Sequence, residues 1–174
     1  MKVYHGSLEI VTNPEIRISD RTLDYGSGFY TTTDYDQARR WVERRKNEGA
    51  DAGFINVYEI SKEAILEKKT LWFDSPSEDW VDFVHENRTN RNFKHDFDFV
   101  YGPVANDKVY AAFALYEDDL LNKQELIAEL KTYVLVDQLL LHTEKALNCL
   151  TFIESIKIMS FKPICTNNRK FSCK

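Results

Sequence analysis

Three short segments, far apart in the sequence, carry side chains that could bind a nucleotide. In YHGS, the imidazole of His5 can donate and accept hydrogen bonds, and Gly6 beside it lets a ligand approach the backbone closely. In GSGFYTT, Tyr30 follows two glycines, which leave room for a planar ring to stack on the tyrosine. In VLVDQLLLH, Gln138 places an amide in an apolar run, and a buried amide needs hydrogen-bond partners.

Each of these side chains also has an ordinary structural explanation. The histidine could bond a neighbouring carbonyl at the end of a strand, tyrosines in strands are usually packed in the core, and the glutamine could face solvent at a strand edge. Taken singly, none of the three is specific for a ligand site.

These segments require elements that bring them together, and the sequence alternates strand-like and helix-like patterns. Thr33 or Asp34 is expected to cap a helix that ends at Gly49, and Thr143 is expected to cap a last short helix. Residues 108–117 fit a strand or a helix equally well. Strands are predicted at residues 2–5, 28–33, 54–60, 97–104 and 136–143, and further helices at 75–88 and 121–134. Short strands dispersed among helices predict an α+β fold in one domain.

Composition is that of an ordinary globular chain. Its 174 residues are 43% hydrophobic and 29% charged, and no apolar run approaches the roughly 20 residues of a membrane helix. The N-terminus lacks the apolar segment of a signal peptide. Cys149, Cys165 and Cys173 form no C-x-x-C pair, which favours reduced thiols over a disulfide framework or a zinc site. We therefore expect a cytoplasmic protein that uses no metal and no membrane.

Charge is unevenly distributed. The formal net charge is −5, and no acidic residue follows Glu154, whereas five basic residues do: Lys157, Lys162, Arg169, Lys170 and Lys174. The acidic body is a poor general nucleic-acid binder, because phosphate affinity comes from clustered Lys and Arg. Residues 154–174 are expected to form a basic C-terminal tail, either a solvated terminus or a contact for an acidic partner.

The order of the three segments resembles the ADP-ribosyltransferase superfamily. The pattern is HG[ST], then G-x-G-[FIL]-Y-[TFA]-x-[ST], then a polar residue opening a short apolar strand near the C-terminus. Within the superfamily it is similar to the branch of diphtheria-type toxins and poly-ADP-ribose polymerases, whose signature is His–Tyr–Glu. His5 with Gly6 and Ser7 looks like the first motif, Tyr30 after its glycines like the second, and Gln138 stands where that branch carries glutamate.

Residues 1–153 also resemble a bacterial family of uncharacterised, toxin-like proteins. The segments YHGS, GSGFYTT, QARRW, DFVYGPVANDKVY and QLLLHTEKAL carry this closer resemblance. It implies a single-domain ADP-ribosyltransferase-like fold, with short strands in a split sheet and flanking helices. It also implies a toxin of a toxin–antitoxin or phage-defence pair, with a small antitoxin as partner protein.

The resemblance implies a role for each site residue. NAD would be the ADP-ribose donor and no metal would be needed. The Gly6 backbone would hold the nicotinamide amide, His5 would bond a ribose hydroxyl, and Ser7 would assist at the adenosine end. Gly28 would leave space for the nicotinamide, which would stack on Tyr30.

Gln138 departs from the superfamily signature. An amide can bond the ribose hydroxyl, but it carries no charge to counter a cationic transition state and cannot act as a base near neutral pH. Two function classes therefore stay open. One is a mono-ADP-ribosyltransferase whose acceptor is a macromolecule, nucleic acid included, or a small molecule. The other is a catalytically silent module that binds nucleotide or protein.

Other polar residues suggest less. His85 and His95 with nearby aspartates match no common metal site by spacing. Arg88 and Arg91 bracket a polar segment, where a surface role or a contact to an NAD diphosphate is expected.

Overall fold

Seven strands form one mixed sheet, and six helices accompany it, in the part of the chain that the computed structural model describes: residues 1–18, 23–50, 52–103 and 107–159. In chain order the elements are β1 (Lys2–Ser7), β2 (Phe29–Thr32), α1 (Tyr35–Asn47), β3 (Gly53–Glu59), α2 (Lys62–Leu66), β4 (Thr70–Trp72), α3 (Glu78–Thr89), β5 (Phe99–Pro103), α4 (Asp107–Glu117), α5 (Lys123–Leu130), β6 (Asp137–Leu141), α6 (Glu144–Leu147) and β7 (Thr151–Ile158). The α+β class and the single domain predicted from the sequence are confirmed.

The sheet is nearly divided between β1 and β2. Its strand order is β4-β5-β6-β2-β1-β3-β7, and all neighbours are antiparallel except β4 and β5. β1 pairs with β3 along its whole length, from Lys2 opposite Glu59 to Ser7 opposite Phe54. With β2 it shares the single pair Tyr4–Thr32. Beyond that pair the two strands diverge, so His5 and the residues after it are unpaired on the β2 side.

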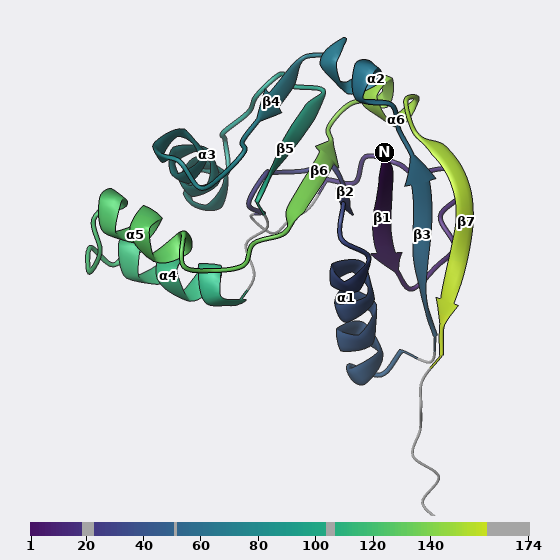
Figure 1. Ribbon diagram of the computed structural model, residues 1–174, viewed down its shortest axis with the longest axis horizontal. Coiled ribbons are helices and arrows are strands. Elements are labelled where there is room, and N and C mark those ends of the chain that lie inside the picture. The colour runs from purple at the N-terminus through teal and green to yellow at the C-terminus, as the bar shows by residue number, and fades with distance from the viewer. Residues whose placement is uncertain (19–22, 51, 104–106, 160–174) are drawn as a thin grey trace, which may run out of the picture.

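Helices flank the two parts of the sheet separately. Figure 1 shows α1 beside β1 and β3, while α3, α4 and α5 lie together near β5 and β6. The larger core packs α3, α4 and α5 against side chains such as Leu140 of β6. Leu139 and Leu141 point into a second core with Val3 and Phe29. Because successive strand residues face opposite sides, the two cores lie on opposite faces of the sheet.

The caps of the first helix follow the sequence signals. The Asp34 carboxylate accepts a hydrogen bond from the Gln37 N–H at 2.6 Å, which satisfies a free donor of the first turn. Gly49 has φ +113° after the last turn, a conformation that favours glycine. Within α1 the side chains of Ala38 and Val42 are buried, whereas Trp41 is 40% exposed.

Several elements differ from the sequence prediction. The ambiguous residues 108–117 are helical in α4. The short elements α2 and β4 and the edge strand β7 were not predicted. β7 crosses the boundary placed at residue 153, so residues 154–158 belong to the sheet and not to a tail. Residues 160–174, with most of the predicted basic tail, lie outside the described residues. No described helix has the length and apolarity needed to span a membrane.

Candidate functional site

His5 bridges the two strands where they begin to diverge. Its Nδ1–H donates a hydrogen bond to the Tyr30 carbonyl oxygen at 2.7 Å, so the first two motifs are joined directly. Burial lowers the pKa of His5, against the smaller raising effect of the Tyr30 carbonyl, and the charge of Arg17 lowers that pKa further. The ring is therefore neutral near pH 7. With Nδ1 protonated, Nε2 is a hydrogen-bond acceptor.

Gly6 is a glycine because α1 lies against it. A Cβ built at Gly6 would stand 2.7 Å from the Ala38 carbonyl oxygen and 3.2 Å from side-chain atoms of Trp41 and Val42. The space that the missing side chain leaves is filled by the helix. Packing alone accounts for this glycine, and the expectation that a ligand approaches its backbone stays a prediction.

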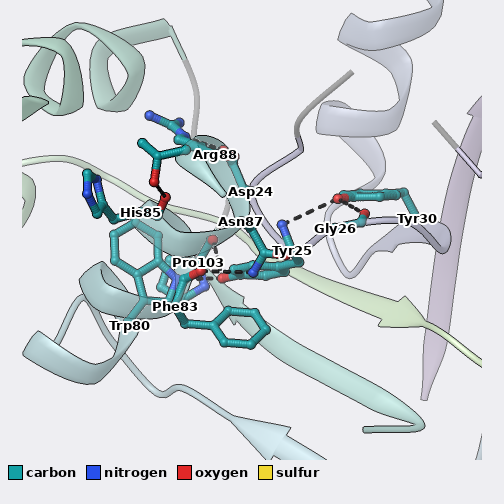
Figure 2. A network of polar contacts seen from close by, with 11 residues as sticks. Asp24, Tyr25, Gly26, Tyr30, Trp80, Phe83, His85, Asn87, Arg88 and Pro103 are labelled. Carbon is teal, nitrogen blue, oxygen red and sulfur yellow. Dashed lines mark hydrogen bonds and ion pairs between the residues drawn. The ribbon is translucent and has the colours of Figure 1, made fainter. Parts of the chain in front are cut away.

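Tyr30 is held at both ends. Its carbonyl accepts from His5, and its hydroxyl donates to the Gly26 carbonyl oxygen at 2.8 Å and accepts from the Tyr25 N–H at 3.4 Å (Figure 2). The ring packs against the larger core, and burial, followed by the charge of Asp24, raises its pKa. The Tyr30 ring is therefore held in place by contacts within the protein.

Gly28 packs against the end of β6. A Cβ there would lie 2.8 Å from the Leu141 carbonyl oxygen and 3.1 Å from Nδ1 of His142. The same His142 nitrogen donates to the Ser27 carbonyl at 2.8 Å. Burial lowers the pKa of His142 to about 4. The segment Ser27–Gly28 before Tyr30 thus packs against the end of β6. Gly28, like Gly6, is required by a close contact within the protein.

Gln138 lies inside the sheet and not at an exposed strand edge. It stands opposite Thr32 on one side and Gly102 on the other, and Thr32 stands opposite Tyr4, so four strands contribute to one row. Gln138 is 6% exposed. It lies two positions from Leu140, the partner of Tyr30, on the same face, which places Gln138 about 7 Å diagonally from Tyr30. The solvent-facing explanation for the glutamine is wrong.

The Tyr25 hydroxyl occupies the space beside Gln138. A Cβ at Gly102 would be 2.6 Å from this hydroxyl, which donates to the Pro103 carbonyl and accepts from Nε1 of Trp80. Burial raises the pKa of Tyr25, and hydrogen bonding by Trp80 and, less strongly, by the nearby Gln138 side chain opposes this in part, although the geometry between Gln138 and Tyr25 is not that of a well-formed hydrogen bond. Nε2 of Gln138 nevertheless is buried without a hydrogen bond to any described residue. An unpartnered buried donor is costly, so a ligand that accepted a hydrogen bond from this atom would recover that cost.

Two predicted site side chains, those of Ser7 and His5, are less closely connected to Tyr30 and Gln138. The Ser7 hydroxyl accepts from the Glu9 N–H at 3.1 Å and stabilises the turn after β1. The ring of His5 lies 4.4 Å from that of Phe29, on the face of β2 opposite to Tyr30. The structure therefore brings His5, Tyr30 and Gln138 onto three adjacent strands, with the His5 side chain on one face and the other two on the second.

Asp137 turns away from Gln138, as strand alternation predicts. Its carboxylate accepts from the Tyr101 hydroxyl at 2.6 Å on the opposite face. Among the described residues, no group of His, Cys, Asp and Glu is arranged to hold a metal ion.

The network of contacts behind Tyr30 was not predicted from the sequence. Arg88, expected at the surface, is buried, and its Nε donates to Asp24 at 2.7 Å. Tyr25, directly after Asp24, is fully buried among aromatic side chains. The only sequence signal was the position of Asp24 and Tyr25 directly before the glycines.

Residues 1–152 match the model of the family described as protein of unknown function (DUF3990), and the chain belongs to that family. Neither the comparison with curated proteins nor that with solved structures finds a match.

Proposed function

We propose that this chain is an NAD-dependent mono-ADP-ribosyltransferase. The observation that carries the proposal is the arrangement at the divergence of β1 and β2. There His5 is bonded to the Tyr30 backbone, and across β2 the buried Gln138 amide has a donor without a partner among the described residues. A scaffold has little reason to keep an unpaired buried amide beside a fixed aromatic ring, whereas a nucleotide site uses both.

Each group has a place in NAD binding. Nicotinamide stacks on Tyr30, and the Gly6 backbone binds its amide. The neutral His5 ring accepts a hydrogen bond from a ribose hydroxyl at Nε2, and Nε2 of Gln138 donates to a hydroxyl of the nicotinamide ribose. Arg17, whose charge acts on His5, is a cation available to the diphosphate.

The reaction breaks the bond between the nicotinamide nitrogen and C1′ of the ribose. Nicotinamide leaves with the electron pair, and the ribose passes through an oxocarbenium-like state. Oriented dipoles around that charge lower the barrier. An acceptor nucleophile then forms a bond to C1′ and loses its proton.

Gln138 limits which acceptors can react. The amide orients the ribose but takes no proton, so the acceptor must be a good nucleophile or supply its own base. Single transfer follows, without elongation to a polymer. By its resemblance to toxin-like proteins, the chain acts as the toxin of a bacterial toxin–antitoxin or phage-defence pair, in the cytoplasm and with a small antitoxin as partner.

Calorimetric titration with NAD tests the site. We expect one saturable site, and Tyr30→Ala should weaken binding about tenfold or more, as loss of a stacking ring does for nucleobases. Tyr133→Ala, at a partly buried tyrosine after α5, is the matched control and should bind as the wild type does. Absence of saturable heat in the wild type, or equal binding by Tyr30→Ala, contradicts the assignment.

A catalytically silent module is the second candidate, and the uncharged Gln138 favours it. Labelled NAD incubated with whole-cell lysate separates the two. A transferase releases nicotinamide and labels a fraction sensitive to protease or nuclease. A silent module binds NAD but releases no nicotinamide with any lysate.

A further inference from the structure

Arg88 of α3 is buried in an unusual setting for an arginine. Its side chain is 8% exposed, and its Nε donates to the Asp24 carboxylate at 2.7 Å. The guanidinium carbon lies 4.1 Å from the ring centroid of Tyr110 and 4.4 Å from that of Phe113, both on α4. A planar guanidinium suits such ring contacts, and a lysine ammonium reproduces neither them nor the directed Nε–H donor.

The partner of Arg88 begins the turn that holds Tyr30. Asp24 is followed by Tyr25 and Gly26; the Tyr25 N–H and the Gly26 carbonyl bind the Tyr30 hydroxyl. Gly26 has φ +76°, and a Cβ there would lie 2.8 Å from Oδ1 of Asn87, the residue before Arg88. Figure 2 shows the connected contacts from Arg88 through Asp24 and Tyr25 to Tyr30. One turn of α3 therefore contacts both ends of the segment Asp24–Gly26.

We propose that Arg88 is a positioning residue for Tyr30. Through its ion pair with Asp24, Arg88 keeps the Asp24–Gly26 turn where the Tyr25 N–H and the Gly26 carbonyl can bind the Tyr30 hydroxyl. The turn in turn keeps the Tyr30 ring in position for stacking. Without its partner, the buried Asp24 carboxylate must reach water or take up a proton, and either change loosens the contact that holds the turn. The proposal rests on the proposed function, because the ring is taken to stack on nicotinamide.

A double-mutant cycle on NAD affinity tests the connection. Arg88→Lys should weaken NAD binding about tenfold, within the range measured for residues in one contact network. If Arg88 acts through the Tyr30 hydroxyl, it should cause little further loss in a Tyr30→Phe background. Arg45→Lys is the matched control, because Arg45 pairs with Glu48 on the exposed side of α1. Wild-type affinity in Arg88→Lys, or additive losses in the double variant, overturns the proposal.

A measurement without NAD separates this proposal from the proposed function. The nine tyrosines are labelled as 3-fluorotyrosine, and the Tyr30 resonance is assigned from its absence in Tyr30→Phe. In unliganded Arg88→Lys the Tyr30 resonance should shift or broaden, and in Arg45→Lys it should not. An unmoved resonance in folded Arg88→Lys overturns the proposal. If wild type binds no NAD while this resonance moves, only the proposed function fails.

A second variant covers the case in which Arg88→Lys does not fold. Asp24→Asn keeps the shape of the partner and removes its charge. It should move the Tyr30 resonance in the same direction, and an unchanged resonance contradicts the proposal as well.

Discussion

Replacing Gln138 with glutamate tests the proposed function, because it introduces the charge that the ADP-ribosyltransferase signature has at the corresponding position, with almost no change in volume. A carboxylate about 4 Å from a developing cation interacts with it by about 4 kcal/mol at an effective dielectric constant of roughly 20. Allowing for screening and for the lost amide contact, we expect a net gain of about 1–3 kcal/mol, or roughly tenfold to a hundredfold in rate. NAD glycohydrolysis should accelerate, because water needs more help than a good acceptor does.

Burial at this position sets the pH dependence of that gain. Gln138 is 6% exposed, and the residues opposite it in the sheet, Thr32 and Gly102, carry no charge. Desolvation will therefore raise the pKa of the new carboxyl above its usual value of about 4.3. The rate of Gln138→Glu should rise with pH as the carboxyl ionises. Its stability relative to wild type should fall as pH rises above the unfolded-state pKa. The loss is about 1.4 kcal/mol for each pH unit by which the folded-state pKa exceeds the unfolded-state pKa.

Nicotinamide release across a pH series, with and without lysate, measures these effects. Asp137→Asn is the matched control, because that side chain lies on the opposite face and should leave glycohydrolysis unchanged. Gln138→Ala should lose both hydrolysis and transfer. A Gln138→Ala variant that retained full transfer would refute the reasoning, since Gln138 could not then line the ribose.

Three further outcomes are expected. Gly6→Ala forces a Cβ to 2.7 Å from the Ala38 carbonyl and should destabilise the fold by about 1–3 kcal/mol in urea unfolding, whereas Gly49→Ala, with open space but φ +113°, should cost about 1 kcal/mol. The lowered pKa of His142, about 4, means that the unfolded state takes up its proton first. Stability should fall between pH 6.5 and 4 by on the order of 2–3 kcal/mol, less so in His142→Gln. Expression without a partner should slow growth, and His5→Ala should restore it; inhibition that persists in His5→Ala points to misfolding instead.

Local signals predicted the elements that carry the site. The Asp34 cap and Gly49 delimit α1, and the apolar run after Gln138 forms β6 as expected. Elements without a local signal were missed: β4 has only three residues, and β7 is an edge strand with charged residues at intervals. Residues 108–117 carried too many apolar positions for periodicity to distinguish a strand from a helix.

The support of the site depends on contacts that no local pattern encodes. Arg88 and Asp24 are 64 positions apart, and Trp80 and Tyr25 are 55 apart. An arginine in a polar segment is predicted to lie at the surface. Arg88 is buried because the fold places a carboxylate and two aromatic rings around it. The sequence indicated His5, Tyr30 and Gln138 as a set, and their role as one ligand site stays a prediction. The network that holds Tyr30 was not predicted.

The glycines of the motifs bear on how the site should be tested. A side chain at any of these three glycines would collide with a neighbouring part of the protein: α1 at Gly6, the end of β6 at Gly28, and the Tyr25 hydroxyl at Gly102. Each glycine is therefore required by a contact within the protein. These contacts explain the three glycines without a ligand. Substituting these glycines therefore tests the fold. Substituting Tyr30, whose ring is already fixed, or Gln138, whose Nε2 has no partner among the described residues, tests the ligand.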